Sequence, residues 1–283
     1  MKKYYFKAVF LVMISALMFS CAAPQVQTTS PVFSPATLAA DQYEPRVDNF
    51  VVILDTSYSM NHKYGEKKKV EIAKEFCAAM NQTLPELNYN GALITFGHDD
   101  SIMLDYGPTQ YSTSGFGSAL NATKAPSGNS SFPLKAAITA AAGELKSSQG
   151  QVAVIIVSDG ENMDQAPVKA AKAMKGEFGN RLCIYTVLVG DNPAGEALMK
   201  QVAAAGECGV SASADGFKDS GAMGDFVKSV FLAKAAPMVV APKPMDSDGD
   251  GVTDDLDQCP NTPKGATVDA RGCWTYAAVV LFD

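Results

Sequence analysis

Short apolar runs alternate with helical patterns between residues 49 and 235 of the chain. The continuous apolar runs predict strands buried on both faces, at 50–54, 92–96, 152–157 and 182–189, with a short edge strand at 101–104 and a last strand at 209–214. Apolar residues spaced three or four apart predict helices at 66–81, 133–146 and 166–175, from Pro193 onward, and around Met223 to Phe231. This alternation predicts an α/β fold with a doubly wound, mostly parallel sheet.

The first predicted helix has one clearly apolar face, formed by Val70, Ala73, Cys77 and Met80. Cys77 therefore faces inward, where we expect a buried free thiol. The charged residues of the segment fill the remaining positions, and we expect them mostly to face water: Lys67, Lys68, Lys69, Glu71 and Lys74.

Polar residues gather where two of the predicted strands end. Asp55, Ser57 and Ser59 follow the first strand in a D-x-S-x-S series, and Asp159 follows the strand at 152–157. Parallel sheets bind ligands beyond the carboxyl ends of their strands, so we expect these side chains to meet there. Carboxylate and hydroxyl oxygens are the ligands that Mg²⁺ prefers. The sequence therefore predicts a metal site at this edge.

This D-x-S-x-S strand end resembles the metal-ion-dependent adhesion site of von Willebrand factor A domains, and the resemblance covers about residues 48–235. It implies Mg²⁺ (or Mn²⁺) bound directly by Ser57 and Ser59, with Asp55 and Asp159 behind them. The family's third ligand is a threonine, but Phe132 stands in its place here. Ser131, one position earlier, is the candidate replacement. The resemblance further implies a protein partner, often one that donates a carboxylate to the metal.

Two other functions compete with metal-dependent binding. A structural envelope protein could keep the fold without metal, with Ser59 merely capping the first helix. A phosphate-ester hydrolase could use Asp55. Such an enzyme requires a second carboxylate two residues later as the general acid, and the chain has Ser57 at that position. The chain has two histidines, and neither a lysine-bearing phosphate loop nor a Ser-His-Asp set stands out. We expect a binding protein rather than an enzyme.

The N-terminus has the layout of an export signal. Lys2, Lys3 and Lys7 precede an apolar run at 8–19, which is shorter than the roughly 20 residues of a spanning helix. Cys21 follows directly and resembles the acylated cysteine of bacterial lipoproteins, which implies a signal peptide at 1–20. Ala22 resembles the residue of lipoproteins sorted to the outer membrane. The alternative is an ordinary cleaved signal, with no role for Cys21.

Two segments with few large apolar residues flank the central domain. Residues 21–47 are rich in Pro, Ser, Thr and Gln and predict a flexible tether between the lipid anchor and the domain at 48–235. Residues 236–245 are a proline-rich linker. The net charge of -7 gives no basic surface for nucleic acid, so we expect no nucleic-acid partner.

Acidic residues after the linker have the spacing of a calcium loop. The ligand positions fall on Asp246, Asp248, Asp250, the Val252 carbonyl, Asp254 and Asp257, and Gly251 permits the sharp turn. A solvated acidic turn is the alternative. Residues 246–274 closely resemble a thrombospondin type-3 repeat, which implies bound Ca²⁺. The segment from 257 to 274 also resembles the linker before outer membrane protein A-like domains, and residues 275–283 resemble the first strand of such a domain.

Four of the six cysteines are candidates for disulfides in an exported chain. Cys259 and Cys273 bracket a short segment, which suggests a local disulfide that pins the repeat. Cys183 begins one predicted strand and Cys208 precedes the last, so a second disulfide requires those strands to be neighbours.

Overall fold

The computed structural model describes residues 33–127, 134–235 and 243–275. The chain divides into two compact units, one that ends at Ala233 and one that begins at Lys234. The first unit contains the described helices and the main sheet, and the second is a small unit of turns.

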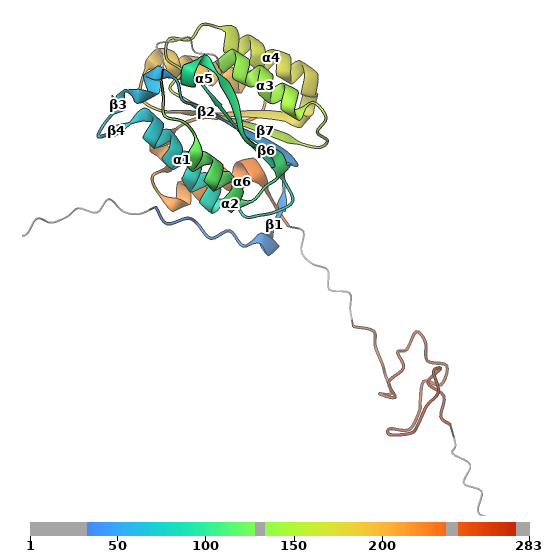
Figure 1. The fold of residues 1–283 in the computed structure, drawn as a ribbon. Coiled ribbons are helices and arrows are strands. Elements are labelled where there is room, and N and C mark those ends of the chain that lie inside the picture. Colours follow the sequence, from blue (N-terminus) through green and yellow to red (C-terminus); the bar gives the residue numbers. More distant parts are fainter. Residues whose placement is uncertain (1–32, 128–133, 236–242, 276–283) are drawn as a thin grey trace, which may run out of the picture. The chain divides into compact units, whose positions relative to one another are not determined.

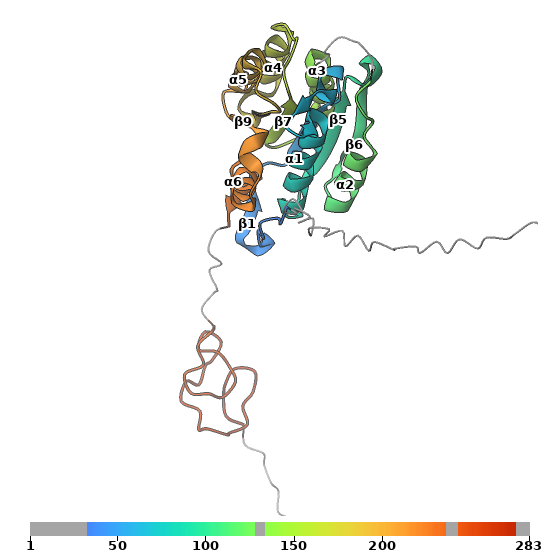
Figure 2. The ribbon, with the colours of Figure 1, turned by 90° about the vertical axis from the view of Figure 1, so that its left-hand side faces the viewer.

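A six-stranded sheet forms the centre of the first unit, in the order β6-β5-β2-β7-β8-β9 (Figure 1). All neighbouring pairs are parallel except β5 and β6, which are antiparallel. The strands are β2 (Asn49–Asp55), β5 (Asn90–Phe96), β6 (Ile102–Gln110), β7 (Val152–Ser158), β8 (Leu182–Leu188) and β9 (Ser211–Ser213). Figure 2 shows β9, β7, β5 and β6 following one another across the sheet. The doubly wound, mostly parallel fold is confirmed.

The strand β2 is buried over its whole length because helices cover both faces of the sheet. Phe50, Val52 and Leu54 point into one core, whereas Val51 and Ile53 point into the other. This is why the strand reads as a continuous apolar run rather than an alternating one.

The helices lie in two groups, one on each face of the sheet (Figure 1). One core receives the apolar residues of α1 (Lys69–Thr83), α2 (Thr113–Ala122) and α6 (Ser220–Phe231). The other receives those of α3 (Leu134–Leu145), α4 (Ala166–Phe178) and α5 (Pro193–Ala205). Asn192 caps α5 by accepting hydrogen bonds from the Ala194 and Gly195 N–H groups.

Short elements complete the first unit. The strands β3 (Lys63–Tyr64) and β4 (Lys67–Lys68) form an antiparallel hairpin, and β1 (Tyr43–Pro45) pairs with β10 (Leu232–Lys234). The 3-10 turns are η1 (Ala40–Gln42), η2 (Tyr58–Asn61), η3 (His98–Asp100), η4 (Gly179–Arg181) and η5 (Ala214–Phe217). Since β1 and η1 lie within the predicted tether, the last residues of that tether belong to the folded unit.

Three other expectations about the elements were wrong. Residues 66–68 are not helical: the helix begins at Lys69, and the Lys68 N–H is held by the Glu71 carboxylate at 2.8 Å. The edge strand runs to Gln110 instead of ending at Leu104. The helix α2 was not predicted, because it contains two glycines and buries only Phe116 and Leu120.

Candidate functional site

The candidate site lies where the strand order reverses. The chain passes from β2 to β5 on one side of the sheet and later returns to place β7 on the other side. β2 and β7 are parallel neighbours in register, with Leu54 opposite Val157. Their carboxyl ends therefore bring Asp55 and Asp159 to the same edge of the sheet, at its topological switch point.

A continuous chain of hydrogen bonds connects the predicted ligands. The Asp55 carboxylate accepts from the Ser57 N–H at 2.8 Å and from the Ser158 hydroxyl at 2.5 Å. The hydroxyl oxygens of Ser57 and Ser59 lie 3.2 Å apart, and Ser59 donates to Asp159 Oδ1 at 3.2 Å. The residues of this hydrogen-bonded chain, Ser158 included, are each at most 2% exposed. Four of the five residues predicted for the metal site therefore meet in one buried cluster.

The cluster concentrates negative charge. Burial raises the pKa of the Asp55 carboxyl to about 7, and the nearby charge of Asp159 adds to this effect, while the hydrogen bonds from Ser158 and Ser57 oppose it. Two buried carboxylates this close normally require a cation or a shared proton.

A lysine supplies one positive charge at the cluster. Lys69 Nζ lies 3.1 Å from Asp159 Oδ2 and 2.5 Å from Glu161 Oε1. Burial alone would lower the pKa of this ammonium, but the hydrogen bonds and charges of Glu161 and Asp159 outweigh it and hold the pKa above its usual value. The expectation that Lys69 faces water was wrong, since its side chain is 7% exposed.

Lys69 was expected to face water because it stands among charged residues at the start of the helix. The hairpin β3–β4 ends at Lys68, so Lys69 is the first residue of α1, and its N–H donates to the His62 carbonyl at 3.0 Å. Lys67 instead forms an exposed ion pair with Glu75. The sequence carried one signal for Lys69, because it lies four residues before Ala73 and is the lysine nearest the apolar face of the helix.

Close backbone approaches hold the site. A Cβ added to Gly97, at the end of β5, would lie 2.5 Å from the Ser57 Cα, and Gly97 has a φ of +100°. A Cβ added to Gly195, in the first turn of α5, would lie 2.0 Å from the Asp159 carbonyl oxygen. Only glycine fits at these positions. Ser131, the predicted third hydroxyl ligand, lies outside the described residues.

In the second unit, three acidic residues of the predicted calcium loop converge. Carboxylate oxygens of Asp246, Asp248 and Asp250 all lie within 4.8 Å of one another. Asp246 accepts hydrogen bonds from the N–H groups of Gly249 and Gly251, which folds the loop around its carboxylate. Asp250 Oδ2 is buried and has no hydrogen-bond partner among the described residues.

The remaining predicted loop ligands are held differently. Both Asp254 oxygens accept from Ser247, from its N–H and its hydroxyl. The Asp257 carboxylate accepts from the Cys259 N–H at 2.7 Å. A Cβ added to Gly272 would contact both Asp257 and Asp250, so those two carboxylates lie beside the same glycine. Val252 donates its N–H to Asp250 Oδ1.

The structure contains both candidate disulfides. Cys259–Cys273 closes the second unit, and Cys183–Cys208 joins the start of β8 to the segment before β9. β8 and β9 are neighbours, which is the condition that the second disulfide required. Cys77 is a buried free thiol, as expected, and burial raises its pKa to about 12.

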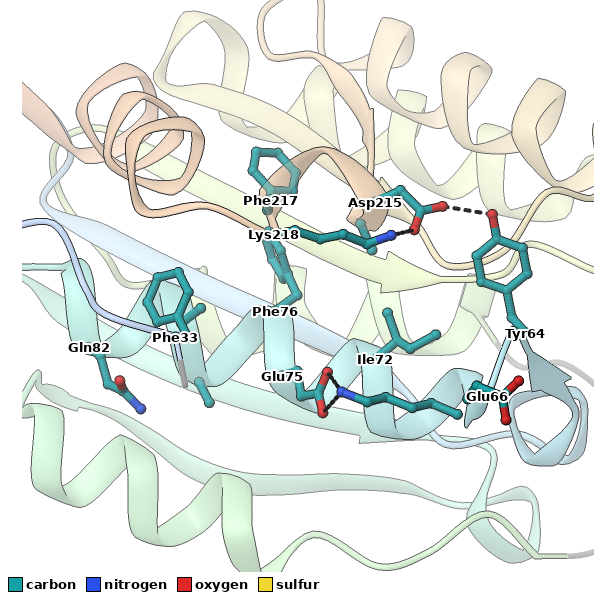
Figure 3. A pocket seen from close by; sticks show the side chains of 15 residues that line it. Phe33, Tyr64, Glu66, Ile72, Glu75, Phe76, Gln82, Asp215, Phe217 and Lys218 are labelled. Atoms are coloured by element: carbon teal, nitrogen blue, oxygen red, sulfur yellow. Dashed lines mark hydrogen bonds and ion pairs between the residues drawn. The ribbon is translucent and has the colours of Figure 1, made fainter. Parts of the chain in front are cut away.

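A separate groove of about 980 Å³ runs along α1 (Figure 3). Ile72, Phe76 and Phe217 form its apolar wall, and Phe33 lies over the helix near Gln82. At one end, Asp215 accepts a hydrogen bond from the Tyr64 hydroxyl at 2.7 Å and pairs with Lys218. The groove contains none of the predicted metal ligands.

Residues 50–161 match the family model described as von Willebrand factor type A domain. This stretch contains both strand ends of the site. Over these residues the first unit is similar to von Willebrand factor type A domains. Among solved structures, the domain is similar to an aerotolerance-related membrane protein from Bacteroides fragilis, at a TM-score of 0.51 and 18% identity, over 64% of this chain and 96% of that one. It is also similar to proximal thread matrix protein 1 of the mussel byssus, at 0.50 and 19%, over 68% and 49%. These likenesses concern the fold.

Two curated proteins are similar to short stretches of the chain. A stretch of 74 residues is 42% identical to outer membrane porin F of Pseudomonas aeruginosa and covers 22% of this chain and 20% of the porin. A stretch of 28 residues is 68% identical to an alpha-agarase of Thalassotalea agarivorans and covers 2% of that enzyme. The chain thus spans a fifth or less of either relative.

Within the described residues, no helix has both the length and the apolar character needed to cross a membrane. The apolar run at 8–19 and Cys21 lie outside those residues.

Proposed function

We propose that this protein is a lipoprotein of the bacterial cell envelope whose A domain binds a protein partner through a divalent metal ion. The observation that carries the proposal is the buried chain of Asp55, Ser57, Ser59 and Asp159 at the switch point of the sheet. Two hydroxyls and two carboxylates at a strand edge supply the oxygen ligands that a divalent metal ion needs.

The donor set fits Mg²⁺ or Mn²⁺. Adjacent ligands of an octahedral Mg²⁺, each about 2.1 Å from the metal, lie roughly 3 Å apart. The Ser57 and Ser59 hydroxyl oxygens are separated by 3.2 Å. These two oxygens would bind the metal directly, while Asp55 and Asp159 would orient them and balance its charge. Ser131 would supply a third hydroxyl, and a carboxylate of the partner would complete the coordination.

Two similarities support the envelope location. The chain shares a stretch with an outer membrane porin, and its fold is similar to that of a protein described as an aerotolerance-related membrane protein. An export signal at 1–20 followed by Cys21 would place a lipid anchor at the N-terminus, with the outer membrane as its destination. A tether of residues 21–47 would give the domain reach from that anchor.

One observation favours the alternative of a structural, metal-free A domain. Lys69 already supplies a positive charge to Asp159. The hydrolase alternative has less support, because Asp55 is 0% exposed and hydrogen bonds engage both of its oxygens. A nucleophilic carboxylate needs a free oxygen that faces its substrate.

Replacing Asp55 by alanine is expected to remove the Mg²⁺ binding of the A domain. The change removes a carboxylate that balances the metal's charge and fixes the Ser57 N–H. Isothermal titration of Mg²⁺ into the wild-type chain and the variant measures the difference, which we expect to be at least a hundredfold in affinity. Asp225→Ala, an exposed carboxylate that pairs with Lys228, is the control.

A pull-down from envelope extract, with and without a chelator, tests the partner. If a partner binds equally well with chelator and to the Asp55→Ala chain, the metal-dependent mechanism is wrong and the structural alternative holds.

We also propose that the second unit binds Ca²⁺ through Asp246, Asp248, Asp250, the Val252 carbonyl, Asp254 and Asp257. The convergence of three carboxylates and the unpartnered Asp250 oxygen support it. The local disulfide Cys259–Cys273 would limit the freedom of the unit before the ion binds.

Asp250→Asn is expected to weaken Ca²⁺ binding at least tenfold, because it removes one negative charge at the loop centre. Trp274 is the chain's one tryptophan and lies beside Cys273, so its fluorescence follows Ca²⁺ titration of this unit. Asp255→Asn, an exposed residue outside the ligand set, serves as the control. An unchanged affinity in Asp250→Asn would contradict the assignment.

A further inference from the structure

The side chain of Lys69, which lies beside Asp159 at the candidate site, packs against Gly190. Lys69 Cε would lie 3.2 Å from a Cβ on Gly190, and Gly190 has a φ of +109°. The absence of a side chain at this position, two residues after the end of β8, leaves room for the lysine stem. Glu161 then receives the ammonium at 2.5 Å. Lys69 is therefore built into the site, whereas its neighbour Lys67 forms an exposed pair with Glu75.

The Lys69 ammonium and the Ser59 hydroxyl both donate to the Asp159 carboxylate. Asp159 Oδ1 accepts from the Ser59 hydroxyl at 3.2 Å, while Asp159 Oδ2 accepts from Lys69 at 3.1 Å. A divalent cation among the hydroxyls would thus sit across a single carboxylate group from a fixed positive charge. The interior screens such repulsion far less than water does. The same ion pair also satisfies Asp159 when no metal is bound.

We propose that Lys69 is a built-in cation that keeps the Mg²⁺ affinity of the free A domain low, so that metal and partner carboxylate bind together. This inference rests on the proposed function, because it concerns the same site. The cluster carries Asp55, Asp159 and Glu161 against one lysine. A carboxylate from the partner adds a negative charge that offsets the lysine. Linkage then requires each ligand to strengthen the binding of the other by the same factor.

The test is isothermal titration of Mg²⁺ into the full chain. Each titration is paired with one in the same chain carrying Asp55→Ala, so that heat from the acidic second unit is subtracted. Lys69→Met removes the charge and keeps the apolar stem, and we expect at least tenfold tighter Mg²⁺ binding. Lys67→Met changes the net charge equally and is expected to bind within twofold of wild type. An unchanged or weaker affinity in a folded Lys69→Met chain overturns the proposal.

A second variant addresses folding and overall charge. Lys69→Met alone leaves Asp159 and Glu161 without their cation, which could destabilise the domain. The double variant Lys69→Met/Glu161→Gln removes one charge of each sign and therefore keeps the net charge of the site. Tighter Mg²⁺ binding than wild type supports a specific effect of the ammonium on Asp159. Affinity equal to or below wild type in the folded double variant overturns it.

Coupling between metal and partner is measured with acetate as the probe carboxylate. Acetate at high concentration is expected to strengthen Mg²⁺ binding more in wild type than in Lys69→Met. Equal strengthening in both chains contradicts the role of Lys69. If Asp55→Ala removes no heat from any chain, the metal site itself fails and the proposed function fails with it. If wild type binds Mg²⁺ and Lys69→Met matches it, only this inference fails.

Discussion

Replacing Gly97 by alanine is expected to remove the proposed metal binding at the ends of β2 and β7 and to destabilise the first unit by about 2–4 kcal/mol. The added methyl group would lie 2.5 Å from the Ser57 Cα and 2.6 Å from its nitrogen, and both contacts are with backbone. The backbone could relieve these contacts only by moving Ser57 away from Asp55, whose carboxylate accepts the Ser57 N–H. A φ of +100° adds strain for any residue with a Cβ. Mg²⁺ titration and thermal unfolding measure the two effects.

Gly179→Ala is the matched control for this change. Gly179 also has a positive φ, of +57°, but nothing lies within 4 Å of its added Cβ. We expect it to cost about 1 kcal/mol of stability and to leave Mg²⁺ binding unchanged. If Gly97→Ala binds Mg²⁺ as wild type does, the contact between the ends of β2 and β5 does not position the metal ligands.

Phe50→Ala is expected to destabilise the first unit by about 3–5 kcal/mol, which is a large fraction of a typical domain's stability. Phe50 is 1% exposed and lies on the central strand β2. Its ring packs against Tyr111 and Phe231 at centroid distances of 5.3 and 5.2 Å, and it also contacts Tyr89 and Phe116. Alanine leaves a cavity where the strand, α2 and α6 meet.

Chemical denaturation followed by the helical circular dichroism signal measures this loss, because the described helices all lie in the first unit. Leu104→Ala is the control, since Leu104 lies on the edge strand β6 and is 45% exposed. We expect it to change stability by no more than about 0.5 kcal/mol. A similar loss in both variants would argue against the aromatic cluster as a main source of stability.

Both predictions concern features that the sequence indicates to different degrees. Phe50 belongs to an apolar run whose burial on both faces was predicted, because only buried parallel strands are apolar on both sides. The contact between Gly97 and Ser57 had no signal in the sequence. It joins two strands separated by a helix, and it exists only because β5 is placed beside β2.

The candidate site likewise has one part that the sequence predicts and one part that only the structure shows. The D-x-S-x-S series and the aspartate after β7 were enough to predict that Asp55, Ser57, Ser59 and Asp159 would meet. The burial of Lys69 was not predicted. The sequence shows no boundary between the strand β4, which ends at Lys68, and the helix α1, which begins at Lys69. A helix that begins at Lys69 instead of residue 66 keeps the same apolar face, so the apolar pattern does not show where the helix begins.

The sequence by itself determined the alternation of strands and helices, the parallel sheet, the two polar strand ends and the spacing of the acidic loop. These follow from periodicity and local chemistry, which neighbouring residues along the chain carry. The tertiary structure alone decided that Lys69 pairs with Asp159, that Gly190 leaves room for the lysine side chain, and that the two strands near Cys183 and Cys208 are neighbours. Such contacts depend on the placement of distant elements in space, and side chains that meet across a sheet leave no mark in the order of residues along it.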